Sequence, residues 1–317
     1  MVTVIIPARH GQQEIKALEA AQKLDYPPER LEILVARGRH PAVQRNRAIH
    51  AAKGDIVYFL DDDSVPAPDN LKRALKHFQE PDVVMVGGPN LCPPEAPFLE
   101  QVFSACMASW LAFGPSCARY DSVGNPRDTS EKELILCNQL ARRQALLDLG
   151  GFDEALYPNE ENALMDELQK RGGRLRYDPA LVVYRRPRQD LKSFWKMVMT
   201  YGRGRAEQFR RHPTYGSILN MAPPFFVLYL VCMAILAAAR HSWFKYGLIL
   251  LGLYCIAVVG QTLVSIPRKG ILRSIFAMPL LVLTHLGYGI GFLRGLFTRL
   301  EPPPPQISEK VELEKVR

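Results

Sequence analysis

The chain has 317 residues, enough for one large domain or two modest ones. It is basic, with 40 Lys and Arg against 32 Asp and Glu and a formal net charge of +8. No basic run is interleaved with aromatic residues as a nucleic-acid-binding surface requires, so we expect no nucleic acid partner. The six cysteines form no CxxC pair, which favours reduced thiols over a disulfide framework or a zinc site.

The first 95 residues alternate between strand and helix patterns. Short β-preferring runs at 2–6, 31–35, 55–61 and 82–86 are separated by amphipathic stretches at 14–24, 41–53 and 71–78. This alternation predicts an α/β fold with a mostly parallel sheet and right-handed crossovers. Later elements are expected at 140–149 and 162–171 (helices) and at 180–184 (a strand). The chain opens on a strand without a charged leader, so we expect no signal peptide.

The strand at 55–61 ends on three consecutive carboxylates, Asp61, Asp62 and Asp63. In an open α/β sheet, ligands bind at the carboxyl ends of the strands. Carboxylates this close repel one another unless a cation lies between them, and oxygen ligands suit a hard divalent ion such as Mg2+ or Mn2+. The sequence therefore predicts a metal or phosphate site at this strand end.

A second acidic pair, Glu160 and Glu161, stands at the start of an expected helix. The helix dipole favours carboxylates at this position in any case, so the position alone assigns no role. A displacement with a metal-bound leaving group at one end needs a base at the other end, to take the proton of the acceptor hydroxyl. The pair is the candidate for that base.

Three apolar runs follow, without a charged residue from 219 to 239, from 246 to 266 and from 275 to 293. Each has about the length that crosses the ~30 Å hydrocarbon core of a membrane. We expect membrane helices at 219–239, 246–266 and 275–297, with membrane lipids as partners. Basic residues precede the first run and separate the second from the third, which places these segments on the cytoplasmic side.

These patterns divide the chain into three parts. We expect a cytoplasmic domain at 1–212, a transmembrane region at 213–300 and a tail at 301–317. The tail contains four consecutive prolines and then a charged segment, which predicts a flexible extension rather than part of a core.

Four motifs stand in a fixed order along the chain: Val4-Ile5-Ile6-Pro7-Ala8-Arg9, Phe59-Leu60-Asp61-Asp62-Asp63-Ser64, Gly150-Gly151-Phe152-Asp153-Glu154 and Glu160-Glu161. With them, residues 1 to about 212 resemble the glycosyltransferase family 2 enzymes of the GT-A fold, whose bacterial members often carry C-terminal membrane helices. The resemblance implies a GT-A (Rossmann-like) nucleotide-sugar-binding domain followed by an α-helical transmembrane region, multi-pass in a bacterial-type cytoplasmic (inner) membrane. It also implies a metal-dependent, inverting hexosyltransferase.

The resemblance assigns duties on the donor side. Asp61 and Asp63 match the ends of the family's DxD motif, one contacting the nucleotide sugar and the other holding Mg2+ or Mn2+ on the diphosphate. Asp62 is grouped with the donor contacts and is expected to point away from the metal. The other donor or nucleotide contacts that the resemblance implies are Pro7, Ala8, Arg9, Arg45, Asn46 and Lys53.

On the acceptor side, Glu161 takes the place of the Asp in the family's Glu-Asp pair, and Glu160 stands beside it. Glu161 is the implied base, with in-line attack and inversion at the anomeric carbon. Arg205 lies in Tyr201-Gly202-Arg203-Gly204-Arg205, which resembles a segment of exopolysaccharide-type transferases that add single sugars. That segment fits either a diphosphate contact or a basic stretch held to anionic headgroups. The remaining implied acceptor or sugar contacts are Asn138 and Arg142 or Arg143.

Two departures from the family pattern stand out. The family places an acidic residue after its second strand to read uracil, but Val35 is followed here by Ala36-Arg37-Gly38, which leaves the nucleotide open. The Gln-x-x-Arg-Trp signature of processive synthases is absent.

The acceptor is open as well. A hydroxyl on a lipid-linked saccharide or glycolipid needs the base that Glu161 offers, whereas a polyprenyl phosphate is already ionised. A different class, the haloacid-dehalogenase-like phosphatases, uses a similar acidic motif with Asp61 as nucleophile, but that motif normally ends the first strand of its domain. A membrane-anchored nucleotide-binding scaffold without catalysis is the third alternative, and the intact acidic motifs argue against it.

Overall fold

The computed structural model describes residues 1–156, 159–211, 220–300 and 310–317. Contacts divide the chain into two compact units. Unit 1 comprises residues 1–93, 118–186 and the described end of 301–317, and unit 2 comprises 94–117 and 187–300. The division differs from the expected boundary at 212, because helices α4 (Phe98–Met107) and α8 (Leu191–Arg211) pack against the C-terminal helix α11 (Ile271–Phe297).

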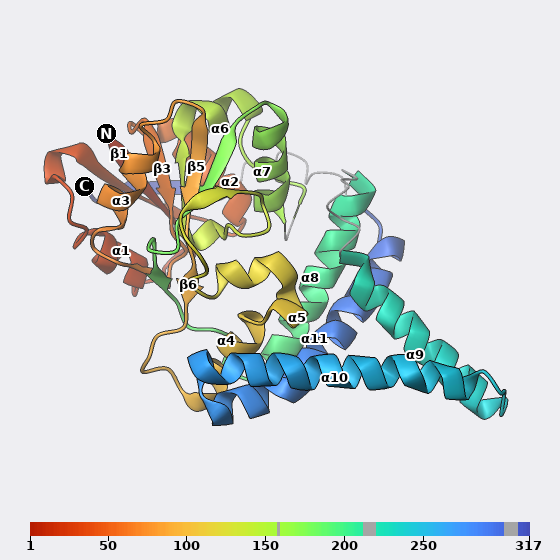
Figure 1. The fold of residues 1–317 in the computed structure, drawn as a ribbon. Coiled ribbons are helices and arrows are strands. Elements are labelled where there is room, and N and C mark those ends of the chain that lie inside the picture. The colour runs from red at the N-terminus through yellow and green to blue at the C-terminus, as the bar shows by residue number, and fades with distance from the viewer. Residues whose placement is uncertain (157–158, 212–219, 301–309) are drawn as a thin grey trace. The chain divides into compact units, whose positions relative to one another are not determined.

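Unit 1 is built on a mixed sheet, whose described strands run in the order β11-β2-β1-β3-β8-β5-β9-β7 (Figure 1). Strands β1, β2 and β3 are parallel, and β8 runs antiparallel between β3 and β5. The α/β prediction is confirmed, although β7, β8 and β11 make the sheet mixed. The bounds are β1 Val2–Ala8, β2 Leu31–Arg37, β3 Ile56–Phe59, β5 Val83–Gly87, β7 Arg127–Thr129, β8 Gln139–Arg142, β9 Arg174–Tyr177 and β11 Glu312–Lys315.

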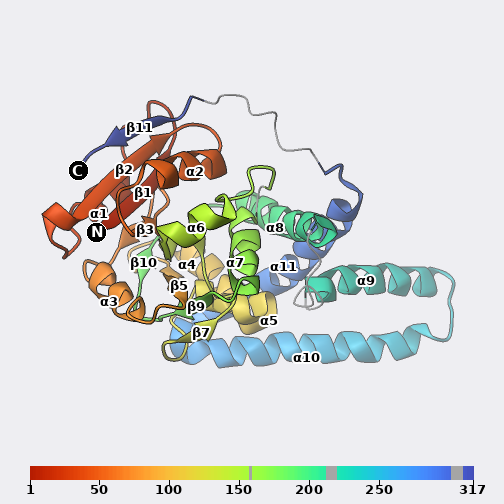
Figure 2. The same cartoon turned by 90° about the horizontal axis from the view of Figure 1, so that it is seen from above.

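Helices cover both faces of this sheet (Figures 1 and 2). The alternation within β1 decides which residues face which layer, because Val4 and Ile6 join one apolar cluster and Ile5 joins the other. Residues of α1 and α3 complete the first cluster, and residues of α2, α6 and α7 complete the second. The bounds are α1 Lys16–Ala21, α2 Pro41–Ala51, α3 Asn70–His77, α6 Arg143–Leu149 and α7 Glu160–Lys170.

The helix expected at 140–149 begins only at Arg143, because Gln139–Arg142 form strand β8. Leu140 and Ala141 are both fully buried, and they pack into opposite apolar clusters. Neighbouring side chains point to opposite sides in a strand but not in a helix. Because residues 139–142 pair with β3 on one side and β5 on the other, they form a strand although their sequence pattern predicts a helix.

A second, three-stranded sheet includes β4 (Val65–Pro66), which begins two residues after the acidic triplet. It contains β4, β10 (Val183–Tyr184) and β6 (Asn90–Leu91), in that order. Strand β10 runs antiparallel to β4, with Tyr184 opposite Val65. The residue after β10, Arg185, therefore comes alongside the segment that precedes β4, where Asp63 stands.

The described part of unit 2 is helical. It includes α4, α5 (Trp110–Phe113), α8, α9 (Ala222–Ala238), α10 (Phe244–Lys269) and α11. By length and composition, α10 and α11 are able to cross a membrane. Helix α9 is apolar but shorter, with 17 residues, and residue 219 of the first expected span lies outside the described residues. Two of the three predicted spans therefore meet the criterion.

Helices α8 and α11 approach each other closely at glycines. A Cβ at Gly202 would overlap the carbonyl oxygen of Tyr288, and one at Gly291 would overlap that of Met199. Gly202 belongs to the Tyr-Gly-Arg-Gly-Arg segment, which is helical. The glycine there permits the two backbones to approach, as small residues do between membrane helices.

The expectation of a flexible tail is wrong for the last residues. Residues 312–315 form β11, which pairs antiparallel with β2, whereas residues 301–309 with the four prolines lie outside the described residues. The edge of a sheet offers unpaired N–H and C=O groups, and a polar segment satisfies them as well as an apolar one.

Candidate active site

The acidic triplet lies at the carboxyl end of β3. Pairing of Phe59 with Ile5 continues one step further, where Leu60 N–H donates to the carbonyl of Ile5 at 3.1 Å. A turn then reverses the chain, with Ser64 N–H donating to the carbonyl of Asp61 at 3.0 Å. The three carboxylates are thus held at the edge where β1 and β3 both end, which is the ligand-binding edge of such a sheet.

Arg45, on α2, joins the two acidic clusters. Its Nη2 lies 2.9 Å from Asp61 Oδ1, and its Nη1 lies 3.4 Å from Glu160 Oε1. The Arg45 and Glu160 side chains are each 6% exposed, so the ion pair is buried. Two carboxylates that lie far apart in the sequence therefore face one guanidinium.

Asn46, the next residue on α2, anchors the loop that leads to the acid pair. Its Oδ1 accepts a hydrogen bond from Phe152 N–H at 2.8 Å, and its Nδ2 donates to the carbonyl of Phe152 and to Glu154 Oε1, both at 2.9 Å. Gly151 has φ +85°, and a Cβ there would overlap Asn46 Oδ1. The glycine of this motif is therefore required for docking the loop on α2.

The acid pair follows a residue in an uncommon conformation. Asn159 adopts a left-handed backbone, φ 95°, directly before α7. Its side chain accepts a hydrogen bond from Asn162 Nδ2 at 2.9 Å, and Arg119 Nη2 donates to Asn162 Oδ1 at 2.7 Å. In this arrangement Glu160 is buried, whereas Glu161 is partly exposed. Glu161 is thus the carboxylate of the pair that a substrate can contact.

The protonation of these groups reflects burial. Burial, together with the neighbouring charge of Glu161, raises the pKa of Glu160 to about 7 against the opposing effect of Arg45. Burial also raises the pKa of Asp63, aided by the charges of Asp61 and Asp62. Burial acts upward on Asp61 too, but two guanidiniums hold the pKa of that carboxyl below its usual value. Burial therefore favours the protonated forms of Glu160 and Asp63, whereas the two guanidiniums favour the ionised form of Asp61.

Arg185 is a site residue that sequence reasoning missed. Its Nη1 lies 2.9 Å from Asp61 Oδ2 and its Nε lies 2.6 Å from Asp63 Oδ1, so it bridges the ends of the triplet. It directly follows β10, and the pairing of β10 with β4 brings it there. Two consecutive arginines after the expected strand at 180–184 are the sequence signal that could have identified this position.

Asp62 turns to a different partner. Its Oδ2 accepts a hydrogen bond from Gln12 Nε2 at 2.6 Å, in the loop after β1. The middle carboxylate thus stabilises a loop, while the outer two face the arginines.

The outer pair fits a divalent cation. Within residues 1–156, 159–211, 220–300 and 310–317, no three His, Cys, Asp or Glu side chains gather as a metal cluster. Asp61 and Asp63 nevertheless present oxygen ligands on either side of one guanidinium, so the space between them accepts a positive charge. Mg2+ is commonly held by one or two carboxylates together with substrate phosphates, and this donor set matches that pattern.

Three of the predicted donor contacts lie at the same edge of the sheet. Pro7 and Ala8 end β1, and Arg9 is exposed directly after it. Lys53 does not join them, and this prediction is wrong. Its N–H donates to Glu32 Oε2 at 2.8 Å just before β3, at the edge where the parallel strands begin. Residues before a strand and residues after it lie at opposite edges of the sheet.

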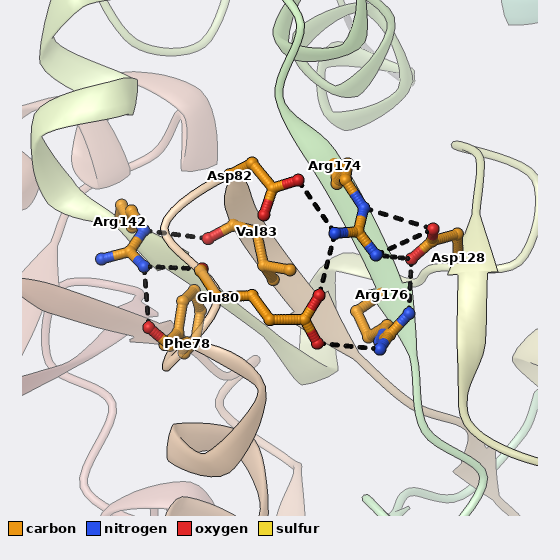
Figure 3. Close-up of polar contacts among 8 residues, drawn as sticks. All are labelled: Phe78, Glu80, Asp82, Val83, Asp128, Arg142, Arg174 and Arg176. Carbon is orange, nitrogen blue, oxygen red and sulfur yellow. Dashed lines mark hydrogen bonds and ion pairs between the residues drawn. The ribbon is translucent and has the colours of Figure 1, made fainter.

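Two of the predicted acceptor contacts belong to the framework instead. Asn138 is fully buried, and its side chain bonds Tyr58 Oη at 2.9 Å and the carbonyl of Leu181 at 2.6 Å. Arg142 donates to the carbonyls of Phe78, Glu80 and Val83 at 2.8–3.1 Å (Figure 3). Through these hydrogen bonds both side chains hold loops to the sheet. Arg205 lies on α8 in unit 2, where its Nη1 donates to Gln208 Oε1 at 3.1 Å.

Two family models match this chain. The family model for glycosyl transferase family 2 matches residues 4–104, and that for glycosyl transferase family group 2 matches residues 56–293. The second match covers well over half of the chain and spans both the acidic triplet and the acid pair. The protein belongs to glycosyl transferase family group 2.

Individual proteins that resemble this chain share low sequence identity with it. The pre-mycofactocin glycosyltransferases of two Mycobacterium tuberculosis strains, CDC 1551 / Oshkosh and ATCC 25618 / H37Rv, are 26% identical over 243 residues. That match covers 67% of this chain and 48% of the relatives, so the chain spans about half their length. A mannosyltransferase from Pyrobaculum calidifontis, solved in complex with GDP-Man and Mn2+, has a similar fold. Its TM-score is 0.58 at 18% identity, over 89% of this chain and 86% of that one, which confirms the GT-A expectation.

Proposed function

We propose that the protein is an inverting glycosyltransferase that moves one sugar from a nucleotide-diphosphate sugar to a hydroxyl of a membrane-associated, lipid-linked saccharide or glycolipid. The contact of Arg45 with both Asp61 and Glu160 carries this proposal, because it joins a diphosphate-binding motif to an acid pair. A transferase needs these two functions on either side of one anomeric carbon.

At the donor end, Asp61 and Asp63 would hold Mg2+ or Mn2+. When bound, the ion would offset the charge of the departing diphosphate. The mannosyltransferase of similar fold was solved in complex with GDP-Man and Mn2+, which favours the same ligand classes here. Pro7, Ala8 and Arg9 would contact the nucleotide, because Pro7 and Ala8 end β1 and Arg9 follows it, at the same edge.

At the acceptor end, Glu161 would take the proton of the attacking hydroxyl. The new bond forms between the acceptor oxygen and the anomeric carbon as the bond from that carbon to the phosphate oxygen breaks. The nucleoside diphosphate leaves with the electron pair of the broken bond, and one displacement inverts the configuration. Partial exposure of Glu161 and burial of Glu160 against Arg45 favour Glu161 as the base.

The helices favour an amphiphilic acceptor. Only 11% of the apolar stretch of α10 is buried, unlike the core helix of a soluble protein. A large exposed apolar surface marks a site of contact with membrane or protein. A lipid-linked acceptor would present its headgroup at the same membrane surface, with the sheet on the cytoplasmic side of a bacterial-type inner membrane.

The test uses the full chain in detergent with a panel of GDP- and UDP-sugars and either Mn2+ or Mg2+. Three acceptors distinguish the alternatives: a glycolipid, a polyprenyl phosphate, and pre-mycofactocin, for which the M. tuberculosis relatives are named. We expect transfer to the glycolipid with inversion, and loss of this transfer in Glu161→Gln. Transfer to polyprenyl phosphate that survives Glu161→Gln would identify the phosphate as the acceptor. If none of the nucleotide sugars binds, the proposal is rejected. A phosphoryl group trapped on Asp61 would support a phosphatase instead.

A further inference from the structure

The C-terminal strand β11 closes one edge of the sheet. Glu312 lies opposite Arg37 and Lys315 lies opposite Leu34. The pairing continues beyond the strand, where Val316 N–H donates to the carbonyl of Ile33 at 3.0 Å. Without β11, strand β2 would be an edge with open backbone groups. The chain supplies the missing neighbour from its own C-terminus.

Side chains anchor this strand on both faces of the sheet. Val311 packs against the apolar cluster that contains Ile5, and Val316 packs against the cluster that contains Val4. Lys315 Nζ lies 3.3 Å from an oxygen of Glu32, a carboxylate that is 2% exposed. Contacts on two faces favour one register, because a shift by one residue would exchange the faces.

Glu314 contacts Arg37, the last residue of β2, at the ligand-binding edge of the sheet. Its Oε2 accepts from Arg37 Nε at 3.0 Å and lies 2.9 Å from Arg37 Nη2, so two nitrogens of the guanidinium contact one carboxylate oxygen. The third nitrogen, Nη1, donates to the carbonyl of Gln12 at 2.8 Å and to that of Arg9 at 3.4 Å. One guanidinium therefore connects the C-terminal strand to the loop that follows β1.

The same loop contacts the acidic triplet. Gln12 Oε1 accepts from Arg9 N–H at 3.2 Å, and Gln12 Nε2 donates to Asp62 Oδ2 at 2.6 Å. The contacts run without a break from Glu314 through Arg37 and Gln12 to Asp62. Strand β11 and the middle carboxylate of the triplet are thus linked, through the Arg37 side chain and through the main chain and side chain of Gln12, within unit 1.

We propose that β11 is part of the donor site, with Glu314 as a positioning residue that fixes Arg37 and, through it, the loop at 9–14. The ligand is a nucleoside diphosphate, and this identity rests on the proposed function. A loop that is already ordered loses less conformational freedom on binding, so fixing it raises affinity without any contact between Glu314 and the ligand. Arg37 and Arg9 add positive charge where β1 and β2 end, which suits a diphosphate.

Glu314→Gln tests the proposal, with Lys315→Gln as the matched control. The control removes the other ion pair of the same strand without altering Arg37. GDP and UDP are titrated into the full chain by calorimetry, and amide exchange is followed at residues 9–14. We expect Glu314→Gln to weaken nucleotide binding about three- to tenfold and to speed exchange at 9–14, while Lys315→Gln changes each by less than about twofold. At saturating donor, kcat should stay near that of the wild type, so the effect falls on KM.

Equal affinity and equal exchange in both variants would overturn the proposal, as would an equal loss in both, which would mean that the strand only stabilises the sheet. If the wild type binds neither GDP nor UDP, the proposed function fails. Amide exchange at 9–14 then still decides whether Glu314 fixes the loop.

Discussion

Two clusters of arginines and carboxylates in unit 1 have the same composition but differ in solvent exposure and in the pKa values of their carboxylates. The site cluster consists of Arg45, Arg185, Asp61, Asp63 and Glu160. The edge cluster consists of Arg174, Arg176, Glu80, Asp82 and Asp128 (Figure 3). Each sets two guanidiniums against three carboxylates at distances of 2.6–3.4 Å. Composition and pairing distance alone therefore do not identify a functional site.

The two clusters differ in how far their side chains are exposed to solvent. The carboxylates of the edge cluster are 44–54% exposed, and hydrogen bonds from Arg174 hold the pKa values of Asp82 and Asp128 below their usual value. In the site cluster, burial raises the pKa values of Asp63 and Glu160 despite their arginines. In the site cluster the Arg45 and Glu160 side chains are 6% exposed and Asp61 is 22% exposed, so water stabilises their charges less than at the edge cluster, although Asp63 is 44% exposed. A buried surplus of negative charge takes up a proton or a cation, which is what a donor site with an acid–base group requires.

The largest expected effect is the loss of catalysis when Glu161 is replaced, compared with a replacement in the edge cluster. Glu161→Gln should reduce kcat about 10²–10⁴-fold, because the amide takes no proton from the acceptor, while donor binding stays near that of the wild type. Asp128→Asn in the edge cluster is the control and should leave kcat unchanged. Steady-state transfer assays with calorimetric donor titration measure both quantities. Full activity in Glu161→Gln with a hydroxyl acceptor would remove this residue as the base.

Arg45→Gln should destabilise unit 1 and slow transfer. The change leaves Asp61 and Glu160 without the buried guanidinium that both contact, which should cost about 3 kcal/mol in the free energy of unfolding. Chemical denaturation in detergent measures this cost, with Arg176→Gln as the matched change in the edge cluster. Equal losses in the two variants would mean that burial does not distinguish the clusters.

Arg185→Gln should strengthen binding of a divalent cation. The guanidinium bridges the two carboxylates that would hold the ion, so its removal should lower the Kd for Mn2+ on the order of tenfold. Electron paramagnetic resonance of free Mn2+ reports the Kd without any turnover, and Arg174→Gln serves as the control. An unchanged or weaker affinity would show that Arg185 does not compete with the ion.

The raised pKa of Glu160 predicts a pH-dependent stability. The folded protein holds this proton more tightly than the unfolded chain, so its contribution is complete below the ordinary pKa and is lost as pH rises through about 7. Between pH 5 and pH 8 the loss should be on the order of 1–3 kcal/mol, with Glu161, Arg45 and Asp61 as the charged neighbours. Glu160→Gln should flatten this part of the profile, and a parallel slope in both proteins would contradict the assignment.

The smallest effect is expected at the edge cluster. Asp128→Asn should lower the melting temperature slightly at low salt and hardly at all at high salt, because exposed ion pairs are screened. Melting curves at two salt concentrations test this. A large loss that persists at high salt would place the edge cluster among the groups that hold the fold together.

Several elements of the site were predictable because their signals are local. The apolar run that ends at Asp61 predicts both the strand and the edge at which its carboxylates emerge. Glu160 and Glu161 follow a glycine-rich loop in a recognisable order. Lys53, Asn138 and Arg142 were misassigned because their position near a motif in the sequence says nothing about which edge or carbonyl they meet. The pairing of β3 with β1 decides the edge at which Lys53 lies, and the pairing of β8 with β3 and β5 decides what Asn138 and Arg142 meet.

By itself the sequence determined the α/β class, the acidic triplet, the acid pair and the apolar runs, because periodicity and adjacent residues carry these features. The tertiary structure decided which charges meet. It brought Arg185 to Asp63 through the register of β10 on β4, joined Asp61 to Glu160 through Arg45, and turned the end of a polar tail into strand β11. Each of these contacts depends on strand pairing or helix packing between segments far apart in the chain, and no local pattern encodes such pairing.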